Sequence, residues 1–469
     1  MKLKLKKYSP LIIFNLLNLI LFLFAVKNSN DVLVYSFFSI ISIISINYFF
    51  IAWQYYTELF LNLFIYLGFW LKFSFNLIYS FNQRIPETNE FLSEVAIRDN
   101  YSEVLIVTSI SILFISLVFL FLKKVFPRKN KRNFSFIFLI FTIKKFKIKF
   151  LTSFFLFFYF IIFLNILFDF AYLGQQSSGF FIIEKLFKGL LIIVFPLFIT
   201  LICDLYFKIH GKSFVILLLL FLSFFSIAIS LDSRSMIVYL LPILLVYIHY
   251  FKTFKYITLL TIISSVLIFI SINLVQKSRS NSEFYNRSLS DTFKEIYYLS
   301  TNRWVGISGM INVHYTKNKN YKMFTDSLSE KSGLFNFYER NFYYSQDENS
   351  LNFKSEDEFL KNIKNYKRIS VYIPGFMAFF YYSGSIFFLL FLNLILIIFL
   401  ILIEKSCAFI MRHNNLFIAM FSMILIWRTI HIGLFPLNTL LFFIILTLVP
   451  FVFLILDKIL LGFIKRKKS

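Results

Sequence analysis

The sequence predicts an all-α, polytopic integral membrane protein with about twelve transmembrane helices, both termini on the cytoplasmic side and one large loop on the opposite side. Three observations predict this fold class. The chain is 59% hydrophobic with a mean hydropathy of +0.75. Its apolar runs approach the ~20 residues that a bilayer requires. Its basic residues gather at the ends of those runs. A water-soluble domain could not bury so many apolar side chains.

The apolar runs define the predicted spans in chain order. The first follows a basic N-terminal segment, and we expect a retained signal anchor because no convincing small-x-small cleavage site follows it. The third is the weakest because Lys72 interrupts it. The predicted spans are 10–26, 32–52, 59–81, 104–122, 150–170, 189–207, 213–231, 235–251, 256–275, 372–402, 413–433 and 438–457.

The loop charges orient these spans. With twelve spans, the basic N-terminus, the loop 123–149 and the basic tail all fall on one side, whereas the acidic loop 82–103 falls on the other. Basic loops mark the cytoplasmic side, so this agreement favours both the count and an N-in, C-in topology. The stretch 133–149 mixes basic and apolar residues and predicts an interfacial helix on the cytoplasmic leaflet.

The spans and loops divide the chain into three regions. Residues 1–275 form a first bundle of about nine helices, which includes the basic cytoplasmic loop 123–149. Residues 276–371 form a polar outside loop of ~95 residues, whose many aromatics predict a partly folded lid with short helices, one of them over 288–299. Residues 372–469 form about three C-terminal helices and a basic cytoplasmic tail.

Composition and motifs exclude several classes of protein. The net charge of +24 lies mainly at span ends, so it does not indicate a nucleic-acid partner. Cys203 and Cys407 have no CxxC or metal-ligand spacing and predict inert thiols without a disulfide. Walker A, HExxH and GxSxG motifs are absent from the sequence, and we expect neither a metal nor another cofactor.

Charged residues within or beside spans are costly in hydrocarbon, so clusters of them are candidate functional sites. The first cluster is Asp232-Ser233-Arg234, in the tight turn between two spans. Arg234 could meet an anionic ligand at the floor of a pocket. A turn in which Asp232 simply pairs with Arg234 is the structural alternative.

Two further clusters follow. Arg303 and Trp304 stand early in the large loop, where the arginine could bind phosphate and the tryptophan could face a sugar ring or anchor in the lipid interface. Arg428 and His431 lie three residues apart near the outer end of a span and so share a helix face. A basic loop surface and a hydrogen-bonded structural histidine are the respective alternatives.

Four stretches give the chain a resemblance to a known family, the O-antigen polymerases, which are Wzy-type oligosaccharide repeat-unit polymerases. They are 231–235 (Leu-Asp-Ser-Arg-Ser), 302–307 (Asn-Arg-Trp-Val-Gly-Ile), 374–384 (Pro-Gly-Phe-Met-Ala-Phe-Phe-Tyr-Tyr-Ser-Gly) and 428–433 (Arg-Thr-Ile-His-Ile-Gly). The layout of many spans, a large external loop and a few final spans is also similar. Ser308 stands where the resemblance leads us to expect an acidic residue.

The resemblance implies a GT-C-like, metal-independent membrane glycosyltransferase of the bacterial inner membrane. Such an enzyme moves a growing glycan from undecaprenyl pyrophosphate onto a newly flipped lipid-linked repeat unit, which builds O-antigen, and thus lipopolysaccharide, or a related surface polysaccharide. Its implied partners are undecaprenyl-pyrophosphate-linked glycans, membrane lipids, and a chain-length regulator and flippase.

The resemblance also suggests roles for individual residues. Arg234, Arg303 and Arg428 would stabilise the charge that develops on the pyrophosphate, and Trp304 would contact substrate. The general base would be His431 as first choice or His314 as second. Asp232 could serve as base or orient an arginine.

Two other readings stay open. An O-antigen ligase shares the layout and the lipid donor and differs in its acceptor. A lipid-linked oligosaccharide flippase or another transporter is disfavoured by the long external loop and by the lack of a run of membrane carboxylates.

Overall fold

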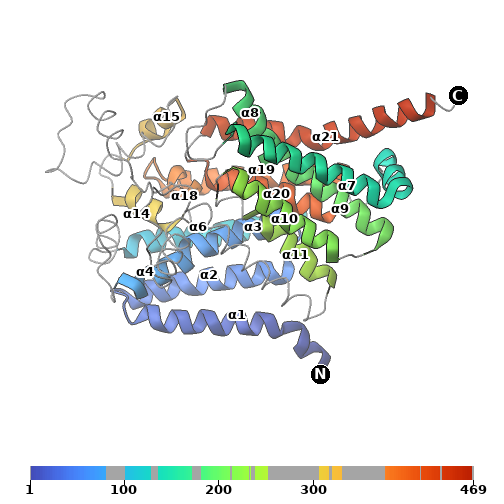
Figure 1. Ribbon diagram of the computed structural model, residues 1–469. Coiled ribbons are helices and arrows are strands. Elements are labelled where there is room, and N and C mark those ends of the chain that lie inside the picture. Colours follow the sequence, from blue (N-terminus) through green and yellow to red (C-terminus); the bar gives the residue numbers. More distant parts are fainter. Residues whose placement is uncertain are drawn as a thin grey trace, which may run out of the picture. The chain divides into compact units, whose positions relative to one another are not determined.

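The chain is all-helical in the residues that the computed structural model describes, which are 2–80, 101–127, 136–171, 181–211, 214–231, 233, 238–251, 306–315, 319–329, 375–411, 414–433 and 436–466 (Figure 1). Seven helices in these ranges are long and apolar enough to cross a membrane. They are Val32–Ala52, Tyr56–Ile78, Ser102–Val125, Lys149–Phe168, Ile182–His210, Ile386–Met411 and Pro436–Gly462. The architecture is therefore that of a multi-pass membrane protein.

One compact unit comprises Met1–Pro127, Tyr297–Ile401 and Ile426–Leu441. Its helices are α1 (Lys2–Val26), α2 (Val32–Ala52), α3 (Tyr56–Ile65), η1 (Tyr66–Leu71), α4 (Lys72–Ser80), α6 (Ser102–Val125), α14 (Ile307–Tyr315), α15 (Tyr321–Ser329), α18 (Phe376–Phe380) and the first part of α19 (Ile386–Met411). Helix α2 packs along both α1 and α6. Trp70, Tyr35, Phe38 and Phe119 are fully buried and fill the core of this unit.

The helix from Tyr56 to Ser80 contains a π-helical turn, because η1 joins α3 directly to α4. A π-turn widens the helix by one residue, and such turns occur frequently at functional sites. Gly68 lies within this turn and Lys72 directly follows it. Lys72 is only 2% exposed, so the predicted third span exists and accommodates its lysine inside the protein.

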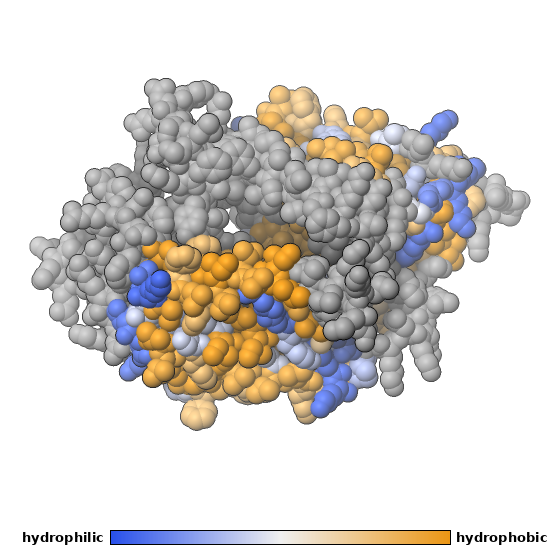
Figure 2. Space-filling model, turned by 90° about the horizontal axis from the view of Figure 1, so that it is seen from below, coloured by the Kyte–Doolittle hydropathy of each residue, from blue (hydrophilic) through white to orange (hydrophobic). Residues whose placement is uncertain are grey.

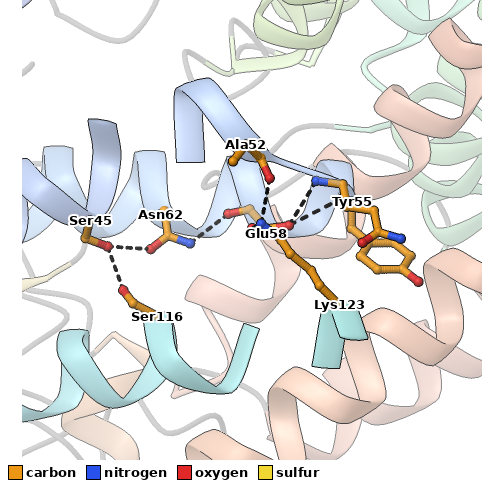
Figure 3. A network of polar contacts seen from close by, with 8 residues as sticks. Ser45, Ala52, Tyr55, Glu58, Asn62, Ser116 and Lys123 are labelled. Atoms are coloured by element: carbon orange, nitrogen blue, oxygen red, sulfur yellow. Dashed lines mark hydrogen bonds and ion pairs between the residues drawn. The ribbon is translucent and has the colours of Figure 1, made fainter. Parts of the chain in front are cut away.

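A buried polar network joins α2, α3 and α6 (Figure 3). Glu58, which is 0% exposed, forms an ion pair with Lys123 and accepts a 3.1 Å hydrogen bond from the Gln54 amide at the start of α3. The Lys123 ammonium also donates to the Ala52 carbonyl at 2.7 Å, at the end of α2. One ion pair thus satisfies the termini of two helices and connects both to α6.

The second compact unit comprises Arg128–Ile296, Leu402–Leu425 and Phe442–Ser469. Its helices are α7 (Ile137–Phe168), α8 (Phe181–Gly189), η2 (Leu190–Val194), α9 (Phe195–His210), α10 (Phe214–Ser230), α11 (Leu240–Phe251), most of α20 (Asn415–Ile430) and most of α21 (Pro436–Arg466). Helices α7, α9 and α10 pack against one another.

Buried carboxylates cap two helices of this unit. Asp204 accepts hydrogen bonds from the Leu416 and Phe417 amides at 2.8 and 3.0 Å, at the start of α20. Asp457 accepts from Phe138 at 3.2 Å and Leu139 at 2.9 Å, at the start of α7. Each carboxylate satisfies amides that have no partner within their own helix.

Large apolar side chains are exposed along many of the described helices. Figure 2 views the α1 side of Figure 1 and shows a broad apolar face. The exposed side chains include Leu17 and Phe24 on α1 and Leu33 and Ile44 on α2, with Leu33 83% exposed. A face of this kind is stable against lipid tails but not against water.

Most predicted spans correspond to described helices, with two differences in extent. The predicted span 372–402 begins too early, because α18 and a turn at Gly384 precede α19, which runs from Ile386 to Met411. The predicted interfacial helix 133–149 is not separate from the next span, since α7 is continuous from Ile137 to Phe168. The predicted span 256–275 and the predicted helix 288–299 lie outside the described residues.

Candidate functional site

Helix α14 is held close to the membrane helices of its unit by a glycine contact. It packs on η1, α6 and α18, and Figure 1 shows it beside α18. A Cβ atom added to Gly306 would lie 2.1 Å from the carbonyl oxygen of Gly68. The two backbones therefore approach too closely for any side chain at position 306.

His314, near the end of α14, lies at the centre of a cluster of titratable side chains. Its Nε2 atom is 3.0 Å from Oε2 of Glu103, and the histidine side chain is 12% exposed against 75% for the glutamate. Its ring stacks nearly parallel to that of Tyr381, with 6.0 Å between centroids and 6° between planes. The sequence analysis selected His314 as a candidate general base, but it did not predict its contact with Glu103 or with Tyr381.

Glu103 is placed by hydrogen bonds around the start of α6. Asp31 caps α2 by accepting from the Val34 amide at 3.1 Å, and its other oxygen accepts from the Ser102 hydroxyl at 2.9 Å. The Tyr101 hydroxyl accepts from the Asn30 amide at 2.7 Å. The hydrogen bonds from Val34 and Ser102 lower the pKa of Asp31, so its carboxylate stays ionised and keeps the ends of the two helices together.

Lys319 closes the other side of the cluster. Its ammonium donates to the His314 carbonyl and lies 5.5 Å from the centroid of the Tyr381 ring. Gly384 has φ +74°, and a Cβ there would lie 3.1 Å from Cβ of Lys319. The turn before α19 thus needs glycine for both conformation and space.

The electrostatics of the cluster act on His314 in opposite directions. Burial lowers the pKa of His314, the hydrogen bond to Glu103 raises it, and the nearby Lys319 lowers it; the net shift is downward. Burial also raises the pKa of Tyr381 and lowers that of Lys319. His314 is therefore neutral at pH 7, the protonation state that a general base requires.

The predicted pair Arg428 and His431 lies at the end of α20, within the same compact unit as His314. The Nδ1 atom of His431 is 2.7 Å from the Trp427 carbonyl, and the two rings are 4.4 Å apart. Trp427 also contacts Phe64 on α3, at 5.9 Å between centroids. The proton on Nδ1 is engaged in this bond, which leaves Nε2 of His431 as an acceptor.

The other predicted site residues, Asp232, Arg234, Arg303 and Trp304, lie outside the described residues. The structure brings His314 together with Tyr381, which belongs to the stretch 374–384, and with Glu103, which no sequence motif singled out. Sequence reasoning also passed over the buried carboxylates Glu58, Asp204 and Asp457. For Asp204 and Asp457, the position inside a predicted span was the available signal.

Within the described part of the chain, no group of three or more His, Cys, Asp or Glu side chains could hold a metal ion. Cys203 and Cys407 are free and buried. No family model matches the chain, and no curated protein or solved structure is significantly similar to it.

Proposed function

We propose that the chain is a polymerase of lipid-linked oligosaccharide repeat units, a metal-independent glycosyltransferase that builds O-antigen or a related polysaccharide. The substrates are two glycans on undecaprenyl pyrophosphate in the bacterial inner membrane, a growing chain and a new repeat unit. The products are the longer glycan on the carrier of the new unit and the undecaprenyl pyrophosphate released from the growing chain.

One observation carries this proposal. The described residues 306–307 and 375–384 belong to two stretches of the resemblance that are distant in sequence, and both lie in the same compact unit. Gly306 directly precedes α14, and α14 packs on α18. His314 near the end of α14 stacks on Tyr381. A glycosyl transfer needs such a grouping of a base, aromatic surfaces and cations beside the membrane.

The proposed topology places this grouping at the periplasmic face. Twelve spans with both termini in the cytoplasm put the start of α6, which carries Glu103, on the same outer side as the large loop, which carries α14. The lipid carrier presents its pyrophosphate at that depth, so the reacting atoms would meet at the outer ends of the helices.

We assign these residues three tasks: stabilising the leaving group, removing a proton and contacting a sugar. Arg428, with Arg234 and Arg303, stabilises the negative charge that grows on the departing pyrophosphate, because guanidinium groups are fixed and always charged. His314 or His431 removes the proton of the attacking hydroxyl. Trp304 faces a sugar ring, and Asp232 orients an arginine or serves as an alternative base.

The first experiment is a gel profile of surface polysaccharide from a strain that lacks the gene. We expect the ladder of polymer lengths to collapse to the core plus a single repeat unit, and a plasmid copy to restore it. Accumulation of full-length polymer on undecaprenyl pyrophosphate would instead assign the ligase reaction. An unchanged ladder would contradict both.

A further inference from the structure

Helix α7 is longer than a bilayer crossing requires. It has 32 residues, but its apolar span is Lys149–Phe168. At ~1.5 Å per residue the whole helix is about 48 Å long, whereas the hydrocarbon core of a bilayer is about 30 Å thick. Residues 137–148 therefore extend beyond the hydrocarbon, on the side that the loop charges assign to the cytoplasm.

This extension of α7 is a fixed part of the second compact unit. Asp457 on α21 is 3% exposed and accepts hydrogen bonds from the Phe138 and Leu139 amides at 3.2 and 2.9 Å. Ile143, one turn further along α7, is 0% exposed. One side of the extension is thus buried in the protein, and Lys458, the residue after Asp457, adds an exposed ammonium group close to the start of α7.

Much of the remaining surface of the extension combines cationic and apolar side chains. We call this surface the basic face of α7, and its members are all exposed: Ile137, Phe141, Lys144, Lys145, Phe146 and Lys149. Phe141, Lys145 and Lys149 recur every four residues and so lie along one side of the helix. The Lys145 ammonium lies 5.8 Å from the centroid of the Phe141 ring and 5.2 Å from that of the Phe146 ring, so cation and aromatic rings lie together on this surface.

Two requirements identify the surroundings that suit the basic face. Ile137 and Phe141 are 51% and 39% exposed, and such apolar side chains are unfavourable in water. Lysine ammonium groups, in contrast, are costly in hydrocarbon. The headgroup layer of a membrane satisfies both requirements, because apolar side chains reach the acyl chains there while lysines extend to the phosphates.

We propose that the basic face of α7 binds the headgroups of anionic phospholipids, such as phosphatidylglycerol, in the cytoplasmic leaflet. Its lysines complement negative charge. A lipid fits better than an acidic protein segment, because the face directly adjoins the membrane span and therefore lies at the depth of the headgroups. This inference does not depend on the proposed function, since no residue of the basic face takes part in the proposed glycosyl transfer.

The test measures lipid binding by the full-length protein. Native mass spectrometry in detergent compares phosphatidylglycerol with phosphatidylcholine of the same acyl chains, and we expect tighter binding of the anionic lipid. A lysine near an anionic surface strengthens binding about fivefold, so Lys144→Gln combined with Lys145→Gln should weaken the binding of phosphatidylglycerol roughly 10–30-fold. Lys144→Arg combined with Lys145→Arg should retain that binding, because the positive charge is what the lipid requires.

A matched pair of substitutions and a second readout locate the site. Lys27→Gln combined with Lys322→Gln removes the same charge from exposed lysines elsewhere in the described chain, and it should change the affinity much less. Hydrogen exchange at residues 137–149 should be slower in nanodiscs of equal parts phosphatidylcholine and phosphatidylglycerol than in nanodiscs of pure phosphatidylcholine. High salt should reduce this difference, because it screens the attraction between lysines and headgroups.

Three results would overturn the proposal. Equal affinity of the wild-type protein for the two lipids would leave the basic face to an acidic protein partner or to water. An equal loss of affinity in the two glutamine pairs would make the net charge of the protein responsible, rather than this surface. Unchanged hydrogen exchange at residues 137–149 in the presence of phosphatidylglycerol would place the bound lipid elsewhere. None of these results bears on the polymerase proposal, which the polysaccharide ladder tests.

Discussion

Gly306 is a position where space, rather than backbone conformation, requires a glycine. A Cβ there would lie 2.1 Å from the Gly68 carbonyl oxygen, which belongs to backbone that cannot rotate away as a flexible side chain could. Gly306→Ala should destabilise the unit by roughly 1–3 kcal/mol through overpacking, and it should reduce repeat-unit joining because α14 carries His314. Thermal denaturation in detergent and the polysaccharide ladder would measure the two effects.

Gly189 provides the control for that substitution. It has helical backbone angles, φ −61° and ψ −45°, and a Cβ there would meet nothing within 4 Å. Gly189→Ala should therefore be neutral or slightly stabilising. Equal stability of Gly306→Ala and Gly189→Ala would show that the close approach of Gly306 and Gly68 is not required.

For individual residues, sequence reasoning selected His314 and the stretch 374–384, but it did not predict that His314 contacts Tyr381 of that stretch. The partners His314 and Glu103 are 211 residues apart, and a carboxylate at the end of an apolar run looks like any loop charge. Local spacing can group Arg428 with His431 on one helix. It carries no information on which distant helix end faces which loop, because packing decides that.

The network of Glu58 and Lys123 shows how a helix end can depend on one ion pair. Glu58 is 0% and Lys123 11% exposed at the side chain, so removal of one partner leaves the other charge buried. Lys123→Met should cost about 3–5 kcal/mol of unfolding free energy. Lys124→Met is the matched control, since Lys124 is the exposed neighbour on the same helix.

A double variant tests whether the pair or the single charge matters. Glu58→Gln combined with Lys123→Met leaves no buried charge, and it should recover part of the stability that Lys123→Met loses. Denaturation midpoints of the single and double variants in one detergent would measure the coupling. If the losses of stability in the two single variants simply added up in the double variant, Glu58 and Lys123 would not act as a coupled pair between α2, α3 and α6.

At the scale of elements, long apolar runs were predictable because hydrocarbon demands a minimum length of apolar helix. The ends of the helices were less predictable from the sequence. The span 372–402 reads as one apolar run, but Gly384 in a left-handed conformation ends the turn after α18 and starts α19 anew. The carboxylates Asp204 and Asp457 fall inside predicted spans and drew no attention there, whereas in the structure they cap neighbouring helices.

For the whole molecule, hydrophobicity predicts where the spans lie, whereas loop charge predicts how they are oriented. Apolar length identifies spans independently of one another, and it accounts for the seven long apolar helices of the described residues. The side on which a loop lies depends on the number of spans that precede it. One span more or fewer would therefore move every later loop to the opposite side of the membrane. The loop charges are the constraint on that sum, because basic loops stay in the cytoplasm.

Topology reporters test this constraint directly. Alkaline phosphatase, which is active only outside the cytoplasm, should be active when fused in the acidic loop 82–103 and inactive in the basic segment 128–135. Green fluorescent protein at the C-terminus should fluoresce, because an even number of spans returns the chain to the side on which it began. Phosphatase activity at the C-terminus would mean an odd number of spans. The error would then lie after residue 135 if both loop fusions behave as expected, and the large loop that carries His314 would have to be tested separately for its side.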